Sequence, residues 1–106
     1  MTTVTLQITV ISREKIMIKN FKDKTLQRLF REDIPATSKQ EEKIKNRLET
    51  IVVASKIEDI RIPGYGLHEL KGDRKGTWSI KISGNWRITF RFEDGNAYDL
   101  NFEDYH

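Results

Sequence analysis

The sequence predicts an α+β fold in which two N-terminal helices pack on one face of an antiparallel sheet. Between residues 23 and 52 apolar side chains recur at helical spacing, whereas from Ile62 onward apolar and polar residues alternate. Glycine-containing turn sequences separate the alternating segments, which is typical of neighbouring antiparallel strands. The order of these patterns places the helices before the sheet.

Both helices have recognisable ends. The first is expected to begin after Asp23, whose carboxylate can cap it, and to end at Ile34-Pro35. Its buried face consists of Leu26, Leu29 and Phe30. The second begins with a capping box, because Glu41 stands three residues after Ser38. Its apolar stripe consists of Ile44, Leu48, Ile51 and Val52.

Four strands are expected after the helices, at residues 67–70, 77–82, 86–92 and 97–102. The last two are joined through Asp94-Gly95-Asn96. A three-residue loop there places Phe90 opposite Leu100, whereas a two-residue loop places Phe90 opposite Asp99. Because opposed residues share a face of the sheet, the apolar partner is preferred and the three-residue loop is predicted.

The same counting predicts which residues meet across the sheet. It pairs Lys81 with Arg87, Arg87 with Glu103, and Trp86 with Asp104, and it places both tryptophans on the apolar face. Like charges in direct opposition cost about 0.2–1 kcal/mol. A surface that binds an anion would benefit from the Lys81–Arg87 pair, which is therefore a first indication of function.

The composition excludes several classes of protein. The chain has 106 residues, enough for one domain, and no cysteine, so disulfides and thiolate metal sites are excluded. The absence of cysteine is typical of proteins of the reducing cytoplasm, so that location is expected. The sequence has neither an apolar run long enough for a membrane span nor a secretory signal. The net charge of +3 favours an anionic partner only weakly. Two histidines make a metal site improbable, and no cofactor motif is present.

Residues able to cleave RNA gather at the predicted strand ends. Cleavage without a metal needs a base for the 2′-hydroxyl, cations beside the phosphate, and an acid for the leaving oxygen. Histidine suits the proton transfers, and arginine matches the geometry of phosphate. The candidates are His68, Lys71, Arg87, Asp104, Tyr105 and His106. Residue types alone leave open that these are ordinary exposed side chains and a frayed terminus.

Four segments of the sequence favour the interpretation of these residues as a functional site. They are residues 17–24 (MIKNFKDK), 67–79 (LHELKGDRKGTWS), 83–92 (SGNWRITFRF) and the ending Asp104-Tyr105-His106. Their sequences and order resemble those of HigB-like plasmid-maintenance killer toxins of the RelE superfamily. The resemblance covers residues 17–106, so residues 1–16 are interpreted as an N-terminal extension, with their alternating pattern favouring an extra edge strand.

The resemblance implies a RelE-like fold and an endoribonuclease, free of cofactors, that cleaves messenger RNA in the ribosomal A site. It implies a HigA-like helix-turn-helix antitoxin as partner, with operator DNA contacted only through that antitoxin. Lys71 and Arg87 would hold the scissile phosphate, and the other four candidates would share positioning and proton transfer. The cations expected to bind RNA nearby are Arg74, Lys81 and Arg91.

Two other functions are compatible with such a fold. One is a non-catalytic poison of the gyrase-inhibitor type, and the other is a plain RNA- or ribosome-binding module. Neither requires histidines beside the cations, whereas a ribonuclease does. The intact cluster therefore favours the enzyme.

Overall fold

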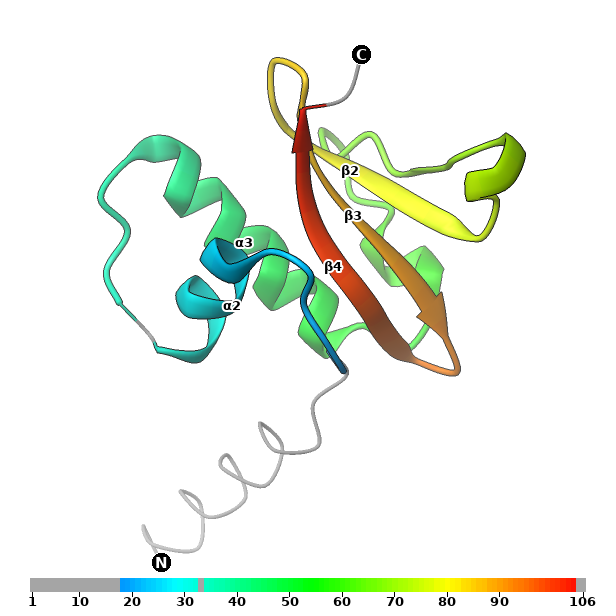
Figure 1. Ribbon diagram of the computed structural model, residues 1–106, viewed down its shortest axis with the longest axis horizontal. Coiled ribbons are helices and arrows are strands. Elements are labelled where there is room, and N and C mark those ends of the chain that lie inside the picture. The colour runs from blue at the N-terminus through cyan, green and yellow to red at the C-terminus, as the bar shows by residue number, and fades with distance from the viewer. Residues whose placement is uncertain (1–17, 33, 105–106) are drawn as a thin grey trace, which may run out of the picture.

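The computed structural model describes residues 18–32 and 34–104, and its elements follow the predicted order, helices before strands (Figure 1). The N-terminal extension predicted at 1–16 and the candidates Tyr105 and His106 lie outside the described residues. The elements are α2 (Lys24–Arg31), α3 (Lys39–Val53), the 3₁₀ turn η1 (Ile57–Ile60), β1 (His68–Glu69), the 3₁₀ turn η2 (Gly72–Arg74), β2 (Thr77–Ser83), β3 (Trp86–Glu93) and β4 (Asn96–Asp104). None of the described helices is both long enough and apolar enough to cross a membrane.

Both helices begin at the side chains predicted to cap them. Asp23 Oδ1 accepts a hydrogen bond from the backbone of Leu26 at 2.9 Å, and Ser38 Oγ accepts one from Glu41 at 3.1 Å. The second half of the predicted capping box differs, because the Glu41 carboxylate reaches one residue further back. It accepts hydrogen bonds from the backbone and hydroxyl of Thr37, each at 2.9 Å.

The four strands form one antiparallel sheet in the order β1-β2-β3-β4, and the two helices cover one face of it (Figure 1). The segment before α2 runs parallel to β4, with bridges from Ile18 to Ala97 and from Phe21 to Leu100. The predicted fold class is therefore confirmed, with this N-terminal segment lying along the β4 edge.

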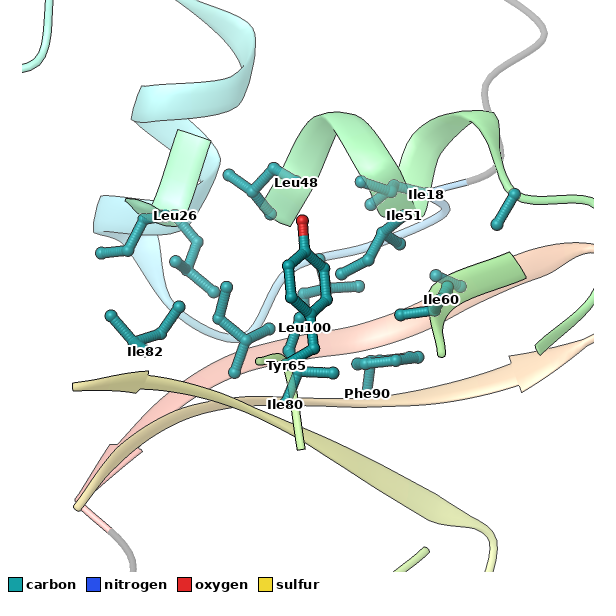
Figure 2. Packing of buried hydrophobic residues seen from close by; sticks show 14 of the residues in the cluster. Ile18, Leu26, Leu48, Ile51, Ile60, Tyr65, Ile80, Ile82, Phe90 and Leu100 are labelled. Atoms are coloured by element: carbon teal, nitrogen blue, oxygen red, sulfur yellow. The ribbon is translucent and has the colours of Figure 1, made fainter. Parts of the chain in front are cut away.

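The core lies between the helices and this face of the sheet (Figure 2). Ile80, Phe90 and Leu100 project from the strands toward the helices, and each is fully buried. On the helix side they meet Leu26, Leu48 and Ile51. Burial of each large apolar side chain stabilises the fold by about 1.5–3 kcal/mol, which makes this interface the main source of stability.

The turn between β3 and β4 differs from the prediction. It is a two-residue turn at Asp94-Gly95, both with positive φ (52° and 78°), and Phe92 pairs with Ala97. The prediction was wrong because it allowed no bulge. In β4 Asp99 adopts a φ of 55°, and the register shifts there, so that Thr89 pairs with Asn101 and Leu100 is buried.

Asn20 supports this bulge from the neighbouring segment. Its side-chain amide donates to Asp99 Oδ1 at 2.7 Å and accepts from the Asp99 backbone at 3.0 Å. Asp99 thus has local partners that stabilise a left-handed backbone, a conformation that costs most side chains about 1–2 kcal/mol.

Between β2 and β3 the predicted opposition of Lys81 and Arg87 is confirmed. The turn itself is one residue shorter than predicted, since Ser83 rather than Ile82 pairs with Trp86 and an irregularity follows Lys81. Both tryptophans belong to the helix-facing side. Trp86 lies at its end, 38% exposed and stacked on Phe102 with ring centroids 4.7 Å apart.

Gly95→Ala should lower the free energy of unfolding by more than about 2 kcal/mol. Alanine at this position would have to adopt a positive φ, which is unfavourable for a residue with a Cβ atom. Its Cβ would also lie only 3.1 Å from the Ser55 carbonyl oxygen. Gly84→Ala is the matched control, because it also has positive φ but open space around it. Urea unfolding of both variants measures the difference, and equal losses would refute the contact with Ser55.

Candidate functional site

The sheet has an open face, directed away from α2 and α3, which carries the polar members of the alternating pattern. Opposed residues share a face, so the register defines two rows of side chains on it. One row runs His68, Ser79, Thr89, Asn101, and the next runs Lys81, Arg87, Glu103. The register thereby brings three of the predicted site residues, His68, Arg87 and Lys81, onto one face.

The Glu103 carboxylate is the best-connected group on the open face. Arg74 forms a bidentate ion pair with it, with Nη1–Oε1 and Nη2–Oε2 distances of 3.0 and 2.7 Å. The Thr89 hydroxyl donates to Oε2 at 2.5 Å, and the Asn101 amide lies 3.4 Å from the same oxygen. Thr89 is only 1% exposed although it points away from the helices.

The ion pair alters the ionisation of Glu103. Hydrogen bonds from the Arg74 guanidinium are the main reason that the pKa of Glu103 falls from 4.5 to about 2, and the Thr89 hydroxyl adds to this while partial burial opposes it. The carboxylate is therefore ionised at physiological pH. Arg74, predicted to bind RNA, lies in this ion pair, and its role toward RNA stays a prediction.

His68 is exposed on the short edge strand β1. Its Nδ1 lies 3.1 Å from the backbone carbonyl oxygen of Gly66, and a carbonyl oxygen can only accept a hydrogen bond. The partner therefore assigns the ring proton to Nδ1. In the neutral ring Nε2 then carries a free lone pair, which is the form a general base requires.

The other predicted cations lie at different places around this face. Lys71 is exposed and immediately precedes η2, in the loop of residues 71–76 between β1 and β2. Arg87 is half-buried near the start of β3, an inner strand of the sheet. Arg91 stands four residues further along β3, roughly 13 Å away along the strand, and pairs with Glu93 at 3.2 Å. The structure thus groups Lys81 with Arg87 and leaves Arg91 apart.

Asp104 ends β4 opposite Trp86, as predicted. His68 and Asp104 belong to the two outer strands of the sheet, three strand spacings or about 14 Å apart across it. Arg87, on β3, lies between them. By its pairing Asp104 shares the helix-facing side with Trp86, whereas His68 and Arg87 share the open face, so the structure does not group Asp104 with them.

A polar pocket of about 240 Å³ adjoins the Arg74–Glu103 ion pair on the open face. Residues of both charges line it, among them Lys22, Asp73, Arg91 and Asp99. Within residues 18–32 and 34–104, no three histidine, aspartate or glutamate side chains are grouped closely enough to hold a metal ion.

The sequence did not reveal the role of Glu103. Counting placed it opposite Arg87, and this pairing is confirmed. The partner in the ion pair was missed, because Arg74 reaches Glu103 from an irregular loop whose path no periodic pattern encodes. The sequence did contain one indication of this role. Glu103 is a glutamate in a predicted strand that is paired with one candidate site residue, Arg87, and is followed in the chain by another, Asp104.

Comparison with known proteins identifies the family. The sequence profile of the RelE-like toxin of the type II toxin-antitoxin system HigB matches residues 19–106. The chain belongs to this HigB-like toxin family. It is 47% identical over 92 residues to "Endoribonuclease HigB" of Proteus vulgaris, covering 85% of this chain and all of that protein. It is also 34% identical over 87 residues to "Toxin HigB-1" of Vibrio cholerae, covering 76% of this chain and 90% of that one.

Membership in this family confirms the RelE-like fold expected from the sequence motifs, and the two helices on a four-stranded antiparallel sheet agree with it. A toxin of a type II system is paired with an antitoxin, so an antitoxin partner follows from the family. The open face described above is therefore a candidate site on a HigB-like toxin.

The Arg74–Glu103 ion pair should make stability depend on pH in the acid range. The pKa of Glu103 is lower in the folded protein (about 2) than its ordinary value of 4.5, so its contribution is complete above pH 4.5 and is lost as pH falls toward 2. The loss should be at most about 3.5 kcal/mol, because one pKa unit corresponds to about 1.4 kcal/mol.

Urea unfolding of the wild type and Glu103→Gln between pH 7 and pH 2 measures this contribution. Glu41, Glu58 and Asp59 also have lowered pKa values and titrate in both proteins, so only the difference between the two curves reports on Glu103. The difference should shrink as pH falls. Curves that stay parallel would contradict the ion pair.

Proposed function

We propose that this toxin is a metal-independent endoribonuclease that cleaves messenger RNA in the ribosomal A site and so arrests translation. The observation that carries the proposal is the placement of a histidine, oriented by the contact of its Nδ1 with the Gly66 carbonyl, on the same open face as Arg87 and Lys81. The name of the Proteus vulgaris relative, an endoribonuclease, supports the same chemistry.

In the proposed reaction the RNA supplies its own nucleophile. His68 Nε2 accepts the proton of the 2′-hydroxyl, and the 2′-oxygen attacks the adjacent phosphorus. Arg87 and Lys71 neutralise the charge that grows on the phosphate oxygens. The bond to the 5′-oxygen breaks, leaving a 2′,3′-cyclic phosphate on the upstream fragment.

The leaving 5′-oxygen needs a proton from the side of the phosphate opposite the base. Asp104, the first residue of the chain ending Asp104-Tyr105-His106, lies on β4, which adjoins β3 on the side away from β1 and His68. We assign the acid to this ending, with His106 as donor and Tyr105 stacking on an unpaired base. Lys81, opposite Arg87, and Arg91, further along β3, would contact the RNA backbone.

We further propose where this toxin acts and what it binds. The ribosome and messenger RNA place the toxin in the cytoplasm, and a HigA-like helix-turn-helix antitoxin would bind it there and contact operator DNA. Residues 17–106 are proposed to carry the activity, with residues 1–16 as an extension. Neither a non-catalytic poison nor a simple RNA-binding module needs a histidine held with its ring proton on Nδ1, so neither function is favoured.

Arg87→Ala or Lys71→Ala should abolish growth arrest while the protein stays folded. Loss of a cation beside the transition-state phosphate should slow cleavage by roughly 10²–10³-fold. Lys43→Ala, which removes an exposed cation from α3, is the matched control and should remain toxic. Growth after induction, with circular dichroism of the purified variants, gives the result. Full toxicity of folded Arg87→Ala would overturn the assignment.

The chemistry of the RNA ends provides an independent test. Attack by the 2′-oxygen leaves a 2′,3′-cyclic or 3′-phosphate upstream and a 5′-hydroxyl downstream. Messenger RNA cleaved on ribosomes by the pure protein should show these ends when the fragments are treated with phosphatase or kinase before mapping. A 3′-hydroxyl with a 5′-phosphate would point to attack by water and exclude the proposed roles of His68 and the chain ending.

A further inference from the structure

The loop of residues 71–76, which carries Lys71, is closed by a few short-range hydrogen bonds. Its turn η2 contains no buried residue. Within the loop, the backbone hydrogen bonds from Arg74 to Lys71 and from Lys75 to Gly72 are 3.4 and 3.1 Å long. At its base Leu70 donates to Thr77 at 2.8 Å, and Gly76 donates to the Glu69 carboxylate at 2.9 Å. All of these contacts lie within residues 69–77, so they close the loop on itself.

Arg74 joins this loop to a distant strand. Its guanidinium meets both oxygens of Glu103 on β4, 29 residues away in sequence. Such a two-point contact fixes orientation as well as distance, which a single hydrogen bond does not. The Arg74 backbone also donates to the Lys71 carbonyl, so the position of Arg74 bears directly on that of Lys71.

Glu103 is itself firmly placed. Thr89 and Asn101 approach its Oε2, and the side chain of Glu103 is only 21% exposed. In the sheet it stands opposite Arg87, and in the chain it precedes Asp104. One carboxylate thus adjoins three parts of the proposed site: the loop with Lys71, the strand with Arg87, and the beginning of the chain ending.

The charge of Glu103 makes a purely electrostatic role in RNA binding implausible. A carboxylate opposite Arg87 repels a phosphate bound there, and its pairing with Arg74 offsets a positive charge that would otherwise attract RNA. If charge alone matters, removing the Glu103 charge should strengthen RNA binding and should not slow cleavage. If Glu103 holds the loop in place, removing its charge should slow cleavage.

We infer that Arg74 and Glu103 are positioning residues: their ion pair holds the 71–76 loop over the open face, so that Lys71 and Arg87 reach the same phosphate. This inference rests on the proposed function. It assigns Arg74 to the architecture of the site in place of the direct RNA contact expected from the sequence. Neither residue touches the reacting atoms.

Cleavage of ribosome-bound messenger RNA by four proteins tests this role: the wild type, Glu103→Gln, Arg74→Ala and the double variant. Glu103→Gln and Arg74→Ala should each lower kcat by about 10- to 100-fold, the range expected when a catalytic group is displaced by about 1 Å, with little change in KM. The double variant should be no slower than the slower single variant, because both changes break one contact.

Two further variants control for charge and folding. Arg74→Lys keeps the charge but loses the planar fork, so it should be slower than wild type. Glu58→Gln breaks the exposed ion pair with Arg61, whose Nε–Oε1 distance is also 2.7 Å, and should leave kcat unchanged. Unchanged or increased kcat in Glu103→Gln, together with a raised KM in Arg74→Ala, would overturn the inference and make Arg74 an RNA contact.

Amide hydrogen exchange in the free proteins tests the same contact without RNA. Exchange at residues 71–76 should be faster in Glu103→Gln and in Arg74→Lys than in wild type, while exchange in α3 stays the same. Unchanged exchange in the loop would overturn the inference whatever the cleavage results. If the wild type cleaves no messenger RNA, the proposed function is refuted. Faster exchange of the loop in the two variants would still support the role of the ion pair in holding the loop.

Discussion

The bulge at Asp99 is the constraint on which the open-face site depends. The two-residue turn at Asp94-Gly95 would by simple alternation direct Leu100 away from the core, and the extra residue in β4 corrects this. The same shift decides the direction of every later residue in β4. Asn101 and Glu103 therefore point to the open face, and the hydrogen bonds of Asn20 to Asp99 stabilise the arrangement from outside the strand.

The two faces of the sheet have different roles: the helix-facing side stabilises the fold, and the open side carries the candidate site. The helix-facing side is filled with large apolar residues such as Phe90 and Leu100, which need no polar partner. The open side carries ionic groups whose interactions are individually modest in free energy but fix geometry. Because the strands are anchored by the core, side chains such as Arg87 can be placed accurately for work on a phosphate without the site itself having to stabilise the fold.

The sequence predicted the features that follow from periodic patterns. The caps at Asp23 and Ser38, the helices-then-sheet order, and the pairings of Arg87 with Glu103 and Trp86 with Asp104 are confirmed. Prediction failed where one residue breaks the period, as at Asp99, since an Asp-Gly turn and a buried Leu100 could be reconciled only by a bulge. It also could not place Arg74, because an irregular loop is positioned by a tertiary contact that local sequence does not encode.

The central claim is that the open face of the sheet receives the RNA. Titration of the isotope-labelled protein with a short single-stranded RNA carrying 2′-O-methyl groups, which block cleavage, tests it most directly by NMR. We expect amide shifts to change along β2, β3 and β4 and in the 71–76 loop, with α2 and α3 unaffected. Changes concentrated on the exposed surface of α3 instead would contradict the account, because RNA would then bind on the helical side of the molecule.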